Sequence, residues 1–213
     1  MKVTVVVPVY NEEKTVASVL EVLTSSDKID NIIVIDDGSQ DNTPKIIREF
    51  KVKVITLKKN TGKGNAVRIA TKDIKSDIIL FLDADLCNLK KEHIDKMLKP
   101  VADGDAAMVI GLMDKGNFIA NMIMPYFPLT GGQRAILTQV FMEIRKSPLI
   151  KGWGLESVMN NYCRKKNLKF STIKLDGVDH VGVQAKKHGL TAFLKQIYDV
   201  VLTRIKLLSV KYD

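Results

Sequence analysis

The sequence predicts an α/β fold in which a mostly parallel β-sheet is flanked by helices. Through the first half of the chain, short apolar runs alternate with segments whose apolar residues recur at helical spacing. Residues 78–82 are apolar at every position, which is typical of a parallel strand buried on both faces. Polar residues follow several of these runs. Because ligands bind at the carboxyl edge of open α/β sheets, we expect functional side chains at that edge.

Each predicted strand is followed by a turn or by a helical pattern. The apolar runs predict strands over residues 3–7, 32–35, 52–57, 78–82, 106–110 and 170–175. Asn11 is predicted to cap the first helix. Thr43 and Pro44 fit the N-cap and the first position of the second helix. The apolar stripes of the first, second and fourth helices are Val16, Val19, Leu20 and Leu23; Ile46, Ile47 and Phe50; and Ile94, Met97, Leu98 and Val101.

The length and composition favour one domain over residues 1–213. The chain is 46% hydrophobic over 213 residues, which allows one α/β domain with a substantial core. Cys87 and Cys163 are its only cysteines, and the sequence opens with a core strand and no secretory leader. These features predict a reduced, cytoplasmic setting. No apolar run reaches the roughly 20 residues needed to cross a bilayer.

The formal net charge of +9 limits the classes of partner. Such a charge suits nucleic acid, anionic lipid headgroups or phosphorylated substrates. The sequence has no zinc-finger spacing and no aromatic motif of the RNA-recognition type. We therefore expect no nucleic-acid partner, and we favour lipid headgroups or phosphorylated substrates.

Asp83 and Asp85 stand one residue apart at the end of the fourth predicted strand. Alternation along an extended chain would send both carboxylates to the same side, and the small Ala84 between them would let a bulky ligand approach. Like charges this close repel each other, and a divalent cation that also carries a substrate's phosphates would compensate them. The pair predicts a metal-diphosphate site suited to a sugar nucleotide. A merely polar strand end is the alternative.

Two other segments suggest contacts with a nucleotide. Asp36 and Asp37 precede a turn at Gly38, where a carboxylate can accept a hydrogen bond from a base or from the following backbone. Lys63 lies between two glycines, as in a phosphate-binding loop. The full Walker pattern is absent, so a kinase or nucleotide hydrolase loses its main support. A lysine on a solvated loop is the alternative for Lys63.

Four motifs follow one another through the first half of the chain: Val7-Pro8-Val9-Tyr10-Asn11-Glu12, Ile35-Asp36-Asp37-Gly38-Ser39, Asn60-Thr61-Gly62-Lys63-Gly64-Asn65-Ala66 and Phe81-Leu82-Asp83-Ala84-Asp85. Together they resemble the family 2 glycosyltransferases of the GT-A type, which are related to the dolichyl-phosphate mannose synthases and glucosyl-phosphoglycerate synthases. A weaker similarity continues through residues 130–134 and 152–156. The resemblance implies a GT-A, Rossmann-like fold. It also implies transfer of a hexose from a UDP- or GDP-sugar, with Mn²⁺ or Mg²⁺ as cofactor.

The same resemblance implies roles for individual residues. Asp37 would read the base, in a pocket lined by Pro8 and Tyr10. His180 is the best match to a late histidine that completes the metal shell in some retaining relatives, although a lone histidine is also compatible with a structural role. The residues implied in nucleotide-sugar binding are Pro8, Tyr10, Glu12, Asp37, Lys63, Asp83 and Ala84, and the implied metal ligands are Asp83, Asp85 and His180.

Two residues of the second half are implied in catalysis by the resemblance. Glu156 would remove the proton of an acceptor hydroxyl in an inverting reaction, whereas an anionic phosphate acceptor would need no base. An acidic residue that favours a helix N-terminus is the alternative for Glu156. Arg134 would offset phosphate charge, and a buried salt bridge is its competing use.

The acceptor is less well indicated than the donor. Residues 1–111 are interpreted as a nucleotide-sugar-binding half and residues 112–189 as an acceptor-side half. The irregular residues 111–128, where the two halves meet, form a buried loop or an acceptor-facing segment. The acceptors considered are a polyprenyl phosphate and a small phosphorylated or hydroxy-acid molecule. Residues 190–213 predict an amphipathic C-terminal helix. That helix would pack on the domain, form a homodimer, or make peripheral contact with the inner face of the membrane.

Four other functions are considered beside hexose transfer to an acceptor. A sugar nucleotidyltransferase would share the architecture but should show a glycine-rich, Arg-containing loop after the first strand, and a dehydrogenase should show Gly-x-Gly-x-x-Gly there. The chain has Pro8-Val9-Tyr10-Asn11-Glu12 at that position. The Gln-x-x-Arg-Trp signature of polysaccharide synthases is also absent, which argues against a polymerase. A noncatalytic protein that binds nucleotide sugars stays open.

Overall fold

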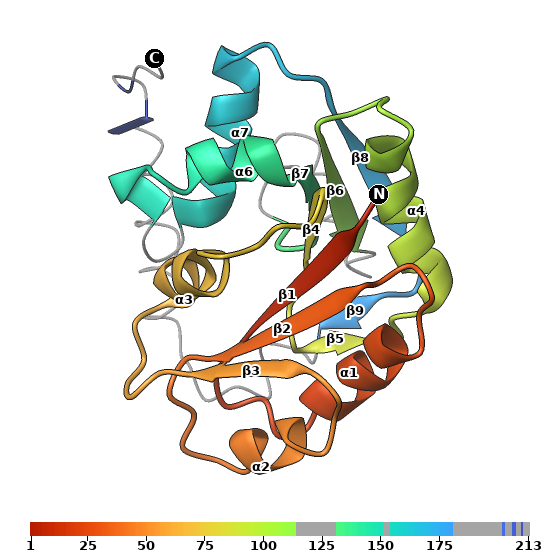
Figure 1. The fold of residues 1–213 in the computed structure, drawn as a ribbon, viewed down its shortest axis with the longest axis vertical. Helices are drawn as coiled ribbons and strands as arrows, with labels where there is room; N and C mark the ends of the chain where they lie inside the picture. Colours follow the sequence, from red (N-terminus) through yellow and green to blue (C-terminus); the bar gives the residue numbers. More distant parts are fainter. Residues whose placement is uncertain (114–130, 151–153, 181–201, 203–205, 208–209, 211–213) are drawn as a thin grey trace, which may run out of the picture.

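A seven-stranded sheet forms the centre of the computed structural model, which describes residues 1–113, 131–150, 154–180, 202, 206–207 and 210 (Figure 1). The strand order is β3-β2-β1-β4-β7-β6-β8. Within this described part, β7 alone runs against its neighbours β4 and β6, and the other pairings are parallel. The strands of the sheet are β1 (Val3–Val9), β2 (Asn31–Asp36), β3 (Lys53–Thr56), β4 (Ile78–Phe81), β6 (Met108–Met113), β7 (Arg134–Leu137) and β8 (Phe170–Leu175).

Helices cover both faces of the sheet, as the apolar strands require (Figure 1). Val5 and Leu80 belong to the hydrophobic cluster that includes residues of α1 and α4, whereas Val6 and Ile79 belong to the cluster that includes residues of α3, α6 and α7. Alternate residues of one strand therefore pack into opposite layers. The helices are α1 (Val16–Thr24), α2 (Thr43–Ile47), α3 (Lys63–Ala70), α4 (Lys91–Ala102), α6 (Thr138–Ile144) and α7 (Leu155–Lys165), with a 3₁₀ turn η1 over Pro148–Ile150.

The predicted α/β class with a mostly parallel sheet is confirmed. The predicted stripes of α1 and α4 are buried throughout, and in α2 Ile47 is fully buried while Ile46 and Phe50 are partly so. The fifth predicted strand is displaced along the chain, because β6 begins at Met108 and extends to Met113. The sequence reasoning missed β7, whose four residues are too few to show a clear period.

Two predicted helix starts are wrong. The prediction that Asn11 caps α1 fails, because that helix begins at Val16 after Thr15. Asn11 instead has a φ of +55°, and its side-chain oxygen accepts a hydrogen bond from the backbone N–H of Gln40. This bond ties the segment after β1 to the loop after β2. The second helix starts one residue earlier than predicted, with Asn42 at the N-cap position.

A small antiparallel ladder stands apart from the main sheet. It consists of β5 (Leu86–Cys87) and β9 (Asp179–His180), with Leu86 opposite His180. The side-chain amide of Asn88 also donates a hydrogen bond to the carbonyl oxygen of Gly177. The ladder thereby fixes a segment from late in the chain beside the end of β4.

Little of the predicted C-terminal helix lies within the described residues. Leu207 is buried in the cluster that includes α7 residues, and the Lys165 ammonium donates hydrogen bonds to the carbonyl oxygens of Leu207 and Val210. The irregular residues 114–128 and the tryptophan of the 152–154 motif lie outside the described part. Among the helices that are described, none is long and apolar enough to span a bilayer.

The turn after β2 predicts that alanine destabilises the protein more at Gly38 than at Gly104. Gly38 and Gly104 both have a φ of +79°, so alanine at either position should cost about 1–2 kcal/mol of unfolding free energy. A Cβ on Gly38 would also lie 2.8 Å from the backbone carbon of Lys59, whereas nothing lies within 4 Å at Gly104. We expect Gly38→Ala to lose roughly 1–3 kcal/mol more than Gly104→Ala in urea denaturation. Equal losses would contradict this packing of the turn.

Candidate active site at the carboxyl edge of the sheet

Asp83, Asp85 and His180 converge just beyond the end of β4. Each offers one ligand atom to a group in which all such atoms lie within 4.8 Å of one another. The Nδ1 atom of His180 is 2.9 Å from Oδ1 of Asp85. The ladder between β5 and β9 produces this approach, because its register places His180 opposite Leu86, next to Asp85. The three residues are partly exposed, as a site open to a ligand requires.

The two aspartates do not converge for the reason that the sequence suggested. Alternation along a continuing strand was expected, but β4 ends at Phe81 and the segment from Asp83 to Asp85 is irregular and turned. Ala84 was expected to leave room for a ligand. Its methyl group instead packs in the hydrophobic core with 3% exposure. The turn therefore directs both carboxylates outward by burying the alanine between them.

Lys63 connects the segment after β4 with the start of α7 at this edge. Its ammonium lies 2.7 Å from Oδ1 of Asp83 and 3.0 Å from Oε1 of Glu156. Lys63 is the first residue of α3, and Glu156 is in the first turn of α7. One positive charge thus compensates two carboxylates that are far apart in the sequence.

The electrostatic surroundings keep Lys63 protonated. Burial by itself would lower the pKa of the Lys63 ammonium, but the charges of Asp83 and Glu156 and their hydrogen bonds outweigh it and raise the pKa above the ordinary value. A raised pKa stabilises the folded state at all pH values below the unfolded pKa. That stabilisation is lost only as the pH rises through the pKa of the folded state. The Lys63 ammonium is therefore charged at neutral pH.

The segment before β7 packs tightly against Asp83. A Cβ on Gly132 would lie 2.3 Å from Oδ2 of Asp83 and 2.7 Å from Nζ of Lys63, so a side chain there would displace one of them. The neighbouring Gln133 is fully buried, and its Nε2 donates a 2.9 Å hydrogen bond to Oδ2 of Asp83. Sequence reasoning assigned no role to Gln133. The available signal was a glutamine that directly follows two glycines and precedes Arg134.

Arg134 is buried at the start of β7. Its guanidinium is 1% exposed, and it donates hydrogen bonds to the carbonyl oxygen of Gly131 at 2.9 Å and to Oδ1 of Asn160 at 2.7 Å. Burial lowers the pKa of Arg134 to about 10, although the nearby Glu156 carboxylate acts in the opposite direction. The hydrogen bonds join the start of β7 to α7. In this structure Arg134 supports the site from beneath and does not line its surface.

Asp37 holds the loop that precedes Lys63. Its Oδ1 accepts hydrogen bonds from the backbone N–H and the hydroxyl of Thr61, and its Oδ2 accepts one from the N–H of Gly62, each at 2.8 Å. The carboxylate is 3% exposed. Asp37 therefore sets the position of α3 and of Lys63. Asp36 closes the turn by accepting a hydrogen bond from the N–H of Ser39.

The remaining predicted donor residues lie along the end of β1. Pro8 is half-buried within that strand, and Tyr10 is 39% exposed directly after it. Glu12 is half-buried, its backbone N–H donates to the hydroxyl of Thr43, and the Thr15 hydroxyl lies 3.3 Å from its Oε2. Tyr10 is thus the aromatic ring of this group that is available to a ligand.

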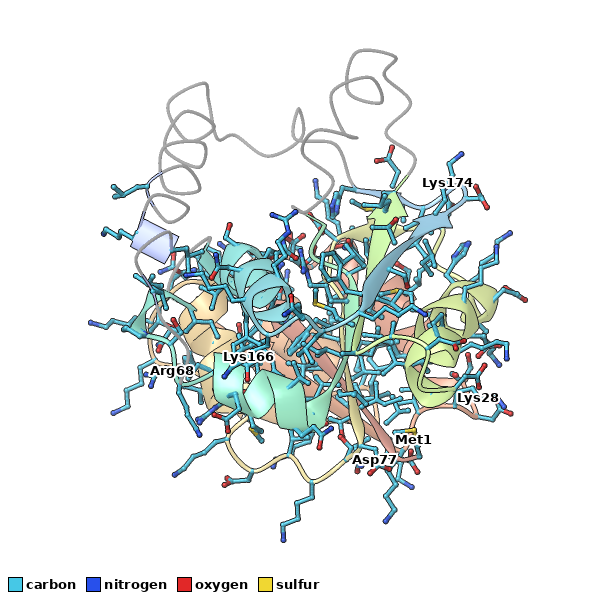
Figure 2. The ribbon with its side chains drawn as sticks, turned by 90° about the horizontal axis from the view of Figure 1, so that it is seen from above. Met1, Lys28, Arg68, Asp77, Lys166 and Lys174 are labelled. Atoms are coloured by element: carbon cyan, nitrogen blue, oxygen red, sulfur yellow. The ribbon has the colours of Figure 1, made fainter. Side chains whose placement is uncertain are left out.

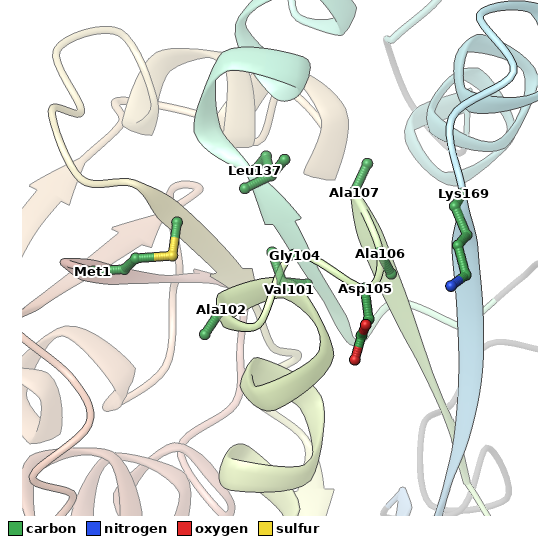
Figure 3. A pocket seen from close by; sticks show the side chains of 9 residues that line it. All are labelled: Met1, Val101, Ala102, Gly104, Asp105, Ala106, Ala107, Leu137 and Lys169. Atoms are coloured by element: carbon green, nitrogen blue, oxygen red, sulfur yellow. The ribbon is translucent and has the colours of Figure 1, made fainter.

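The surface away from this edge shows no comparable concentration of functional groups among the described residues. Figure 2 shows the exposed side chains of Lys28, Arg68, Lys166 and Lys174 around the outside of the fold, on different elements. A hollow of about 430 Å³ lies at the opposite edge of the sheet, before β6 and β8 (Figure 3). Apolar residues such as Met1 and Val101 line much of it, with Asp105 and Lys169 as its charged residues. The hollow is separate from the carboxylate site.

The fold and the acidic edge identify the class of protein to which the chain belongs. The family model "Glycosyl transferase family 2" matches residues 4–143, and the chain belongs to this family. The matched region contains Lys63, Asp83 and Gln133, whereas Glu156 and His180 lie beyond it.

Curated relatives agree with this family. "Glycosyltransferase AglJ" of Haloferax volcanii is 29% identical over 194 residues, which are 80% of this chain and 61% of the relative. "Dolichyl-phosphate beta-glucosyltransferase" of Mus musculus is 37% identical over 118 residues, 48% of this chain and 36% of the relative. "Undecaprenyl-phosphate 4-deoxy-4-formamido-L-arabinose transferase" of Edwardsiella ictaluri is 33% identical over 112 residues, 48% and 34% respectively. The chain thus spans between about a third and three-fifths of the length of these relatives.

Solved structures show the same fold. Glucosyl-3-phosphoglycerate synthase from Mycobacterium tuberculosis, in complex with Mn²⁺, UDP and glucosyl-3-phosphoglycerate, has a TM-score of 0.81 at 20% identity, over 99% of this chain and 81% of that one. A complex of the same synthase with Mg²⁺ and UDP gives a TM-score of 0.82, over 99% and 80% respectively. The GT-A, Rossmann-like architecture is therefore confirmed.

The ion pairs of Lys63 predict that its replacement destabilises the protein more than replacement of a surface lysine does. Lys63→Met leaves two partly buried carboxylates without their counter-charge, which should cost about 2–3 kcal/mol at pH 7. Lys99→Met is the matched control, because Lys99 pairs with Asp103 on the exposed face of α4 and such pairs contribute little. Urea denaturation of both variants measures the difference. Similar, small losses would show that the bridge of Lys63 does not stabilise this edge.

Proposed function

We propose that this chain transfers a hexose from a UDP- or GDP-sugar to an acceptor that carries a phosphate. The observation that carries this proposal is the convergence of Asp83, Asp85 and His180 beside Lys63 at the carboxyl edge of the sheet. Membership of glycosyl transferase family 2 supports transfer over nucleotide synthesis or hydride chemistry. Residues 1–111 would serve the donor and residues 112–189 the acceptor.

The chemistry of the three candidate ligands fits a divalent cation. Two carboxylates and one imidazole are suitable ligands for Mn²⁺, and carboxylate oxygens also suit Mg²⁺. Asp83, Asp85 and His180 would hold the ion. When bound, the cation would supply positive charge to the diphosphate that departs. Mn²⁺ with UDP in a solved relative of the same fold gives this assignment further support.

The chain's own groups would bind and orient the donor. The exposed ring of Tyr10, with Pro8 and Glu12 beside it, offers a surface for the base, and Asp37 fixes the loop that leads to Lys63. The Lys63 ammonium would add a second positive charge near the diphosphate. Glu156 already holds the Lys63 ammonium at this edge before any ligand arrives, so the charge stays near the site even if a cation takes its place on Asp83.

Glu156 is the candidate base on the acceptor side. Its carboxylate lies at the start of α7, and Lys63 holds it within the same group of charges as Asp83. With a hydroxyl acceptor, Glu156 would take the proton as the new glycosidic bond forms. With a phosphate acceptor, the oxygen is already anionic and Glu156 would only position Lys63. Arg134 would contribute indirectly, by fixing α7 through Asn160.

A phosphate-bearing acceptor agrees with the relatives and with the charge of the chain. Two curated relatives are named for dolichyl phosphate and undecaprenyl phosphate, and a solved relative is bound to glucosyl-3-phosphoglycerate. A net charge of +9 favours anionic acceptors of either kind. Peripheral membrane contact and a homodimer through residues 190–213 stay predictions, because most of that segment lies outside the described residues.

Release of nucleoside diphosphate tests the proposal. The full chain is incubated with UDP- and GDP-hexoses and Mn²⁺ or Mg²⁺, and then with a polyprenyl phosphate or with 3-phosphoglycerate. We expect product only with one donor base, a divalent cation and one of the two acceptors. Chelation by EDTA should stop the reaction, and readdition of the metal should restore it. Donor binding with neither transfer nor hydrolysis would support a noncatalytic binding protein instead.

Asp85→Asn should separate the role of the metal ligand from the stability of the fold. Asp85 is partly exposed, so we expect little change in thermal unfolding but a loss of turnover of at least about 100-fold, because one charged ligand is removed. Asp105→Asn is the control, because Asp105 is exposed at the opposite edge of the sheet (Figure 3). Undiminished metal-dependent turnover in Asp85→Asn would contradict the proposed site.

A further inference from the structure

Gln133 and Lys63 hold the two oxygens of the Asp83 carboxylate separately. The Gln133 Nε2 donates to Oδ2 at 2.9 Å, and the Lys63 ammonium donates to Oδ1 at 2.7 Å. Both oxygens of a proposed metal ligand are thus bonded to side chains of the protein itself. A cation that binds Asp83 must share or replace one of these two donors.

The two donors differ in how easily they can move. Gln133 is fully buried, and its backbone carbonyl oxygen accepts a 2.9 Å hydrogen bond from the backbone N–H of Gly111 in β6. It also directly precedes β7, whose register with β4 is fixed from Arg134 opposite Phe81. Lys63 has a long, flexible stem, and its side chain is 23% exposed. Gln133 is therefore the fixed partner of Asp83, and Lys63 is the exchangeable one.

The side-chain oxygen of Gln133, Oε1, indicates that packing alone does not explain this buried amide, and that its bond to Asp83 does. Its Oε1 is buried and finds no hydrogen-bond partner in the part of the chain that the structure describes. The opposite orientation of the amide would place Oε1 against the negative carboxylate, so the bond to Asp83 determines the orientation. A buried acceptor without a donor is unfavourable, and an apolar side chain of the same size would avoid that cost. The hydrogen bond that Nε2 donates to Asp83 therefore accounts for a polar residue at this buried position.

We propose that Gln133 is a positioning residue that fixes Oδ2 of Asp83, so that Oδ1 is the oxygen presented to the divalent cation in exchange for the Lys63 ammonium. The inference rests on the proposed metal-dependent function. It assigns a different role to each oxygen of the Asp83 carboxylate. It also assigns a role to Gln133, which is not itself a proposed metal ligand. Partners that orient a ligand in this way typically change metal affinity by roughly 10–100-fold when they are removed.

Binding of Mn²⁺ to the full chain, with and without UDP, tests the inference without a need for turnover. Electron paramagnetic resonance of free Mn²⁺ measures the affinity. We expect Gln133→Met to weaken Mn²⁺ binding by roughly 10-fold or more. Thr138→Val is the matched control, because Thr138 is also buried beside β7 and its hydroxyl has no partner among the described residues. Thr138 follows the other end of β7, where its backbone N–H donates to the carbonyl oxygen of Asp77. The Mn²⁺ affinity of this control should equal that of the wild type.

Two further variants distinguish positioning from general damage. Lys63→Met removes a cation that competes for Oδ1, so in the absence of UDP it should leave Mn²⁺ binding unchanged or tighten it, opposite in sign to Gln133→Met. In an Asp83→Asn background, Gln133→Met should have no additional effect on Mn²⁺ affinity, because both act through one carboxylate. Additive losses, or weaker binding in Lys63→Met, would overturn the inference.

A measurement on the unaltered chain does not depend on the folding of any variant. The assigned side-chain amide of Gln133 should exchange slowly with solvent in NMR spectra, and should continue to do so after Mg²⁺ and UDP are added. Loss of its protection on binding would overturn the inference. If the wild type binds neither Mn²⁺ nor Mg²⁺, with or without UDP, the proposed function fails as well. If it binds them and Gln133→Met binds Mn²⁺ equally well, only the role of Gln133 is wrong.

Discussion

The Lys63 ammonium, shared between Asp83 and Glu156, is the interaction on which the rest of the site depends. Without it, two carboxylates on different elements would repel each other at the same edge of the sheet. Several features of the fold place Lys63 there. Asp37 fixes the loop before α3, Gly62 adopts a φ of +87° that allows the helix to begin, and Gly132 leaves space for the ammonium. The loop after β2, the start of α3 and the segment before β7 thus all contribute to the position of one ammonium group.

The arrangement also explains how the end of β4 is connected to α7. Asp83 follows β4 in the matched family region, whereas Glu156 belongs to α7 beyond it. The two are linked directly through Lys63 and indirectly through Arg134, which joins the start of β7 to Asn160 of α7. Asp83 and Glu156 are thus held together by a direct ion-pair bridge and by a buried hydrogen bond between their elements.

The sequence predicted the parallel sheet and the helical stripes because buried strands and amphipathic helices have clear periods, as at Ile79 and at Leu20. It also predicted that Asp83, Asp85 and His180 belong to one site, and the structure brings their ligand atoms together. The pairing of β5 with β9, which makes this possible, has only two residues in each strand and no periodic signal. The roles of Gln133 and Arg134 depend on the reversed β7, so local sequence could not show which of these two buried side chains contacts Asp83. The Asn11 cap failed because a tertiary bond to Gln40 took precedence over local preference.

The sheet order has a consequence during synthesis. β4 pairs with β1 on one side, but its other neighbour, β7, is translated only after α4 and β6. Until then a nascent chain holds the apolar β4 with one row of backbone donors and acceptors unpaired, which is a surface prone to association with other chains. The same late pairing covers the open edge of β4 and brings Gln133 to Asp83, so both changes occur together, before Glu156 and His180 are translated.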